Sequence, residues 1–208
     1  MANKPKTLKE LIDFYYDKFK PLYSAVQQTN SVPMEMLFEI NAAFDHLTRR
    51  WHYDETEEKV VNTACAHLKR GCFDVFKILV SQTRKKYDEL KQTDLSLVDN
   101  GEFLRDLNWL WAEIEKLAIA ARMAEGDSRA ETAWHNAFDQ WEPVKEKCDR
   151  LSNDFFLSPK VQWAKDKENE TAKRAKRESY FKGVAIGVIA SFIFWLLSQS
   201  AAVISVWF

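Results

Sequence analysis

Residues 183–208 contain no Asp, Glu, Lys or Arg, although 29% of the whole chain is charged. As an α-helix rising about 1.5 Å per residue, this stretch would reach roughly 39 Å. About 20 apolar residues are enough to cross the hydrocarbon core of a bilayer. A core helix of a soluble protein is rarely so long and so free of charge. The sequence therefore predicts a single membrane-spanning helix over 183–208.

The charge that the tail lacks is distributed unevenly over the rest of the chain. Residues 1–159 hold 22 Lys and Arg against 27 Asp and Glu, whereas 160–182 hold 8 against 4. Five cations crowd the N-terminal edge of the expected span: Lys173, Arg174, Lys176, Arg177 and Lys182. Positive flanks stay on the cytoplasmic side and attract anionic lipid headgroups. We therefore expect a tail-anchored, single-pass protein with its N-terminus in the cytoplasm, in the inner membrane if the host is bacterial.

The remainder of the chain has the pattern of a helical bundle. Gly and Pro number only five each, too few for the many turns of a sandwich or barrel. Apolar residues recur at helical spacing in several segments. The expected helices cover 7–28 with a disturbance at Pro21, 34–51, about 57–92 with a bend at Gly71, about 98–126, 127–157 with a disturbance at Pro143, and 158 onward. The prediction is an all-α protein with a helical cytoplasmic head (1–157), a basic juxtamembrane helix (158–182) and a transmembrane helix (183–208).

The expected span has one small, hydroxylated face and one bulky apolar face. On a helical wheel the small face comprises Gly183, Gly187, Ser191, Ser198, Ala202 and Ser205, with Phe194 near it. Small residues four apart let two helices approach closely. One interpretation is a packing seam, or serines bonded back to their own helix carbonyls. The other is a homo-oligomer whose hydroxyls line a water path and in which Phe194 or Trp195 forms an apolar constriction.

Three cations lie seven residues apart on the third expected helix. Arg70, Lys77 and Arg84 would share one face and could bind a nucleotide or oligonucleotide. The alternative is an ordinary solvated face, because acidic residues are equally dense in the head. The partners that the sequence leaves open are thus the lipid bilayer, further copies of the chain, and a nucleotide, oligonucleotide or protein.

Patterns for metal or cofactor binding are weak. Glu39 and His46 are one heptad apart, and Cys65, His67 and Cys72 share a helix, but none has the HExxH or paired ExxH spacing that brings ligands together. The three cysteines, which include Cys148, lack CxxC spacing, so reduced thiols are expected. The chain has no Gly-rich phosphate loop. We therefore expect no metal site and no cofactor.

The segment from Arg129 to His135, RAETAWH, resembles the Arg-x4–6-His motif of the HEPN ribonucleases. HEPN domains are helical bundles, and the resemblance implies that Arg129 and His135 would serve phosphodiester cleavage. The polar residue usual just after the Arg is replaced by Ala130. A similar segment, from Asn41 to His46, has Asn in place of the Arg. A membrane-tethered ribonuclease is therefore one alternative, although the expected protein is not an enzyme.

The layout of a small helical head followed by KGVAIGVIASFIFWLLSQS resembles the membrane effectors of bacterial anti-phage immunity. The resemblance implies a head that senses a signal raised by infection, and spans that associate and depolarise the membrane. We expect such an effector, because a plain anchor does not need one small, hydroxylated stripe. The alternative is a tail-anchored adaptor or scaffold without channel activity.

Overall fold

The computed structural model describes residues 4–27, 33–126 and 133–204, with side chains over 4–27, 33–125 and 137–195. Every regular element in these ranges is helical, which confirms the all-α class. The contacts divide the chain into two compact units, Met1–Val161 and Gln162–Phe208. We call the first unit the head. The predicted boundaries at 157 and 182 stay predictions.

The first expected helix is a helix with a widened turn in its middle. It consists of α1 (Leu8–Phe14), the π-helical turn η1 (Tyr15–Phe19) and α2 (Lys20–Gln27). Thr7 and Glu10 form a capping box at its start, because each side chain accepts a hydrogen bond from the backbone of the other. Pro21 lies inside α2 and does not end the helix. A proline ring clashes with the carbonyl four residues earlier, and the π-helical turn at that point relieves the clash.

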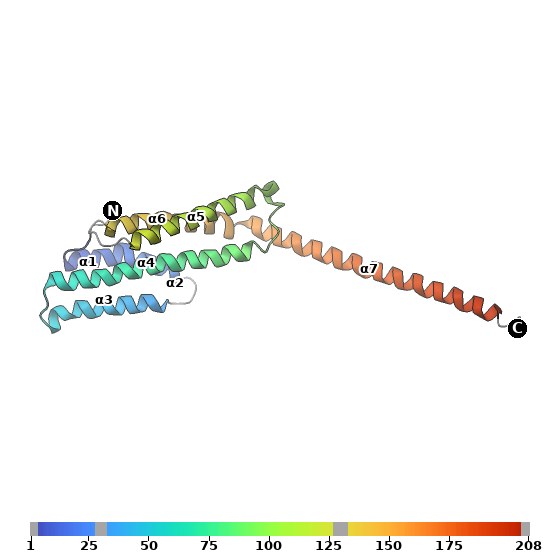
Figure 1. The fold of residues 1–208 in the computed structure, drawn as a ribbon, viewed down its shortest axis with the longest axis horizontal. Coiled ribbons are helices and arrows are strands. Elements are labelled where there is room, and N and C mark those ends of the chain that lie inside the picture. Colours follow the sequence, from blue (N-terminus) through green and yellow to red (C-terminus); the bar gives the residue numbers. More distant parts are fainter. Residues whose placement is uncertain (1–3, 28–32, 127–132, 205–208) are drawn as a thin grey trace. The chain divides into compact units, whose positions relative to one another are not determined.

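The long helix α4 (Glu57–Leu90) is the centre of the head (Figure 1). The Thr56 side chain caps it by accepting from the Lys59 backbone N–H. Helix α3 (Met34–His52) packs along one side of α4, and α6 (Ala133–Leu151) along another. Helix α4 continues through Gly71 as one helix, and the expected bend there stays a prediction. A Cβ at Gly71 would lie 2.7 Å from Phe19 Cε2, so the glycine allows the first helix to pack closely on α4.

Helices α5 (Glu102–Gly126) and α6 (Ala133–Leu151) form an antiparallel pair that packs on α4 (Figure 1). The short 3₁₀ turn η2 (Val98–Gly101) precedes α5, and the π-helical turn η3 (Ser152–Phe156) follows α6. Pro143 lies inside α6, so the expected disturbance does not break this helix. The Trp141 ring is fully buried and stacks on Phe76 of α4 with a centroid distance of 5.6 Å. This contact places the centre of the core between α4 and α6.

Helix α7 extends from Pro159 to Ile204 as one continuous helix, as the sequence predicts from Ser158 onward. Pro159 is its first residue, the position where a missing N–H costs no hydrogen bond. Its second half carries the apolar stretch. Helix α7 therefore contains both the expected juxtamembrane segment and the described part of the expected span.

Candidate functional site

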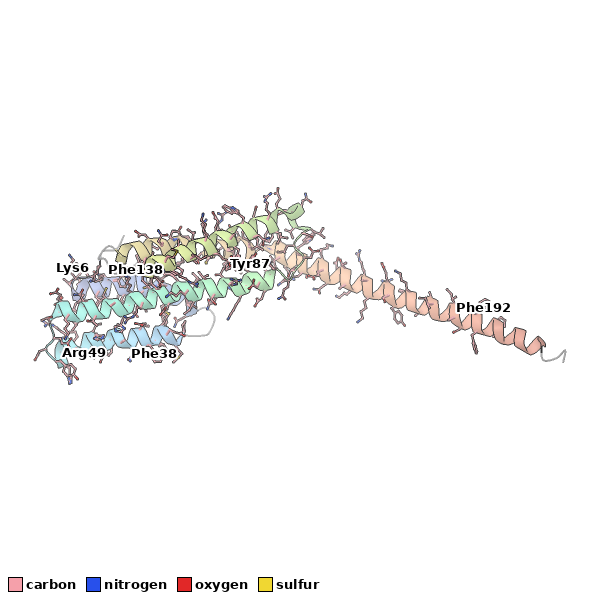
Figure 2. The ribbon with its side chains drawn as sticks, viewed as in Figure 1. Lys6, Phe38, Arg49, Tyr87, Phe138 and Phe192 are labelled. Atoms are coloured by element: carbon pink, nitrogen blue, oxygen red, sulfur yellow. The ribbon has the colours of Figure 1, made fainter. Side chains whose placement is uncertain are left out.

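The apolar part of α7 is the first candidate site. Pro159–Trp195 is long and apolar enough to cross a membrane, and none of its most apolar window is buried within the described chain. A core helix of a soluble protein would pass the same test of length and composition but would be mostly buried. The side chains of Ile193 and Phe194 are 51% and 75% exposed, and Phe192 stands off the helix (Figure 2). Among the residues whose side chains are described, the bulky surface of this segment is exposed and is not packed within its own unit.

The small face of the span is open where its side chains are described. A Cβ added at Gly183 or Gly187 would meet no atom within 4 Å. The Ser191 hydroxyl donates to the Gly187 carbonyl oxygen at 2.8 Å, so this serine is satisfied within its own helix. Ser198 and Ala202 lie on the α7 backbone outside the described side chains, and Ser205 lies outside the described residues. The glycines thus leave a surface on which a second helix could approach closely.

The expected juxtamembrane cations all lie on α7 and are exposed. Their side chains belong to Lys173, Arg174, Lys176, Arg177 and Lys182. Arg177 covers the Phe181 ring at 5.7 Å, an arrangement suited to the boundary between headgroups and water. The segment is therefore available to an anionic surface.

The three cations of α4 are each paired with carboxylates. Arg70 contacts Glu39 of α3 at 3.3 Å, and Lys77 contacts Glu125 of α5 at 2.9 Å. Arg84 contacts Glu115 of α5 at 3.1 Å. An anionic ligand would have to displace these partners, so the stripe serves first to join α4 to its neighbours. The predicted ligand surface stays a prediction.

Two histidines meet between α3 and α4, an arrangement that the sequence does not predict. The rings of His46 and His67 stack with centroids 5.0 Å apart. His67 Nδ1 lies 2.7 Å from Glu39 Oε2, the carboxylate that also pairs with Arg70. Burial, and then the nearby Arg49 and His67, lower the pKa of His46. Among the described residues, no three His, Cys, Asp or Glu side chains group as metal ligands would.

The cysteines are unreactive in the folded head, and the side chains of the ribonuclease motif lie outside those that the structure describes. Cys65, Cys72 and Cys148 are buried free thiols, and burial raises the pKa of Cys65 to about 12 and of Cys148 to about 11. Such thiols are poor nucleophiles. Arg129 lies outside the described residues, and His135 is placed on α6 without its side chain. The ribonuclease alternative therefore stays a prediction.

Sequence reasoning missed an apolar groove in the head. It lies between α1–η1 and α3, has a volume of about 420 Å³ and has Leu68 of α4 among its lining. Ile12 and Tyr16 stand on one rim and Phe44 on the other, each more than half exposed. The feature of the sequence that could have predicted this groove is the set of apolar residues on α3 at positions that α4 does not cover.

Comparison of the chain with protein-family models, with curated proteins and with solved structures found no match.

Proposed function

We propose that this chain is a membrane-anchored effector. Its head lies in the cytoplasm and senses a ligand or a protein partner, and its spans associate into a homo-oligomer that leaks ions or disrupts the bilayer. The observation that carries the proposal is the surface of α7 in its described part: an apolar segment with exposed side chains and with an open strip at Gly183 and Gly187. Lipid would cover the bulky side, and a second span would cover the strip.

The orientation rests on the cations of α7. Lys173, Arg174, Lys176 and Arg177 lie on the N-terminal side of the apolar segment. Because such flanks are retained in the cytoplasm, the head is on that side, which in a bacterium is the inner face of the inner membrane. The same cations would hold the start of the span against anionic headgroups, at about 1 kcal/mol for each Lys or Arg near the surface.

The proposal is tested by leakage from vesicles loaded with a fluorescent dye. The full chain is reconstituted over a series of protein-to-lipid ratios, because high ratios favour association without the natural signal. The triple variant Ser191→Leu, Ser198→Leu and Ser205→Leu should insert but release at least about tenfold less dye, since it replaces the small face with bulk. The matched control is Ile186→Leu, Ile189→Leu and Ile193→Leu on the opposite face, which should leak like the wild type. Equal leakage from both triple variants, or none from the wild type at any ratio, would contradict the effector.

One observation favours a second candidate, a membrane-anchored adaptor without channel activity. The Ser191 hydroxyl is already bonded to the Gly187 carbonyl, so it does not need water in a pore. An adaptor would keep its function when residues 183–208 are replaced by an unrelated apolar span. The effector would lose dye release after the same replacement.

A further inference from the structure

Helix α3 carries an apolar surface that the head leaves uncovered. It packs on α4 through Met36 and Ala43, the fully buried members of its 19 residues. Phe44 and Trp51 lie on one flank of the helix beside this contact, and Phe38 lies on the opposite side; they are 64%, 71% and 66% exposed. Figure 2 shows Phe38 and Arg49 on this edge helix of the head. Such a concentration of exposed aromatic side chains is typical of an interface.

The apolar surface continues from α3 across the groove to the first helix. Phe44 lines the groove from α3, and Ile12 and Tyr16 line it from α1 and η1. Aromatic side chains account for about 150–250 Å² each when fully buried, so the exposed parts of Tyr16, Phe44 and Trp51 come to about 300–500 Å². One partner in a standard protein interface buries about 800 Å². These three side chains would therefore supply about half of one side of such an interface.

The spacing along α3 is that of a helix-pairing seam. Leu37, Phe44 and Trp51 are seven residues apart, and Met34, Asn41 and Thr48 form a second series three residues earlier. Alternating steps of three and four are the pattern of two helices packed side by side. Asn41 is an exposed polar residue within the seam, and a single such residue can fix which helix faces which.

The charges of α3 indicate the direction of pairing. Its first turn carries Glu35, and its last turn carries Arg49, Arg50 and His52. Arg49 already forms an ion pair with Asp45 of its own helix at 2.7 Å. The attraction between two copies of α3 would therefore act between their oppositely charged ends and would not depend on one new ion pair. When two copies of α3 lie side by side in opposite directions, the acidic first turn of each copy lies against the basic last turn of the other. Parallel copies would place like ends together.

From the exposed aromatic side chains, the spacing and the charges, we propose that a second copy of this chain docks on the head through α3, with the two α3 helices antiparallel. The groove beside α3 receives the partner copy's side chains. A two-fold axis then passes near the middle of α3, and each copy contributes the same surface. This pairing concerns the head alone and goes beyond the association of spans in the proposed function.

The test is chemical cross-linking of the full chain in detergent or lipid. The native thiols are buried, so a cysteine introduced on α3 is the reactive one. Met34→Cys and His52→Cys, at opposite ends of α3, are co-expressed with different tags and treated with a short bis-maleimide. The antiparallel dimer predicts cross-links between the two variants and none within either variant alone, because 18 residues of helix separate like positions by about 27 Å. Cross-links within each variant alone, or none in the mixture, would overturn the proposal.

Two further variants separate the head from the span. Phe44→Glu should lower the cross-linked fraction at least about tenfold, because it places a charge in the seam. Met123→Glu, on an exposed apolar residue of α5, is the matched control and should leave the cross-linked fraction unchanged. Gly187→Leu should also leave the cross-linked fraction unchanged, even if this variant releases no dye. Loss of cross-linking with Gly187→Leu but not with Phe44→Glu would place the association in the span and overturn head pairing.

Discussion

At the scale of single residues, the helical glycines occupy two different environments, one at Gly71 and the other at Gly183 and Gly187. Gly71 is helical and buried, and its missing side chain makes room for the Phe19 ring. Gly183 and Gly187 are also helical, but no described atom lies within 4 Å of a Cβ added at either of them. Glycine in a helix costs about 0.5–1 kcal/mol relative to alanine. At Gly71 the close packing with Phe19 offsets that cost, whereas no described contact does so at the other two positions.

Gly71→Ala should therefore destabilise the head. The new Cβ would lie 2.7 Å from a ring that is itself 1% exposed, and overpacking of this kind costs about 1–3 kcal/mol. The gain in helix propensity recovers part of this cost. Thermal unfolding of the full chain should show a midpoint lower by about 2–4 °C for each kcal/mol lost. Gly183→Ala is the control and should leave the unfolding of the head unchanged; a Gly71→Ala chain as stable as the wild type would refute the packing argument.

At the scale of elements, the sequence predicts most of the helices because each buries one periodic apolar face. The starts at Thr56 and Pro159 follow from capping residues that act locally. The effects of Pro21 and Pro143 could not be predicted, since both helices continue through their prolines with support from neighbouring elements. The groove and the pair formed by His46 and His67 also could not be predicted, because both depend on how α3 lies against its neighbours. The glycine strip of α7 could be predicted, because it depends on spacing within one helix.

The contact between α3 and α4 should weaken in mild acid. The pKa of His46 is lowered in the folded chain, first by burial and then by Arg49 of its own helix and His67 of α4, while Asp45 and Glu55 act in the opposite direction. His46 therefore takes up a proton at a higher pH in the unfolded chain than in the folded chain. As the pH falls below about 6.5, protonation of His46 favours the unfolded chain, and the free energy of unfolding decreases. The midpoint of thermal unfolding should fall between pH 7.5 and 5.5 by more in the wild type than in His46→Gln. His52→Gln, on an exposed histidine, is the control; an equal fall in all three chains would contradict this account.

At the scale of the whole molecule, the chain joins a helical head to a long helix whose described apolar side chains are exposed. The head supplies a core around Trp141 and an uncovered surface on α3, and the second unit supplies the cations and the span. The two proposed contacts differ in kind, because the one on α3 uses aromatic side chains and the one on α7 uses small residues. An assembly held at both places would couple the head to the membrane without any catalytic group. The whole account depends on the apolar segment of α7 lying in lipid.

That claim is tested most directly by the access of a membrane-impermeant maleimide to single cysteines in reconstituted vesicles. Ile193→Cys places a thiol in the apolar segment, and Lys173→Cys places one in the basic segment. Both native side chains are exposed in the described part of the chain, so the two positions differ in the surface that each would meet in a vesicle. The account predicts labelling at 173 and protection at 193 until detergent dissolves the vesicles. Equal and rapid labelling of both positions in intact vesicles would contradict it.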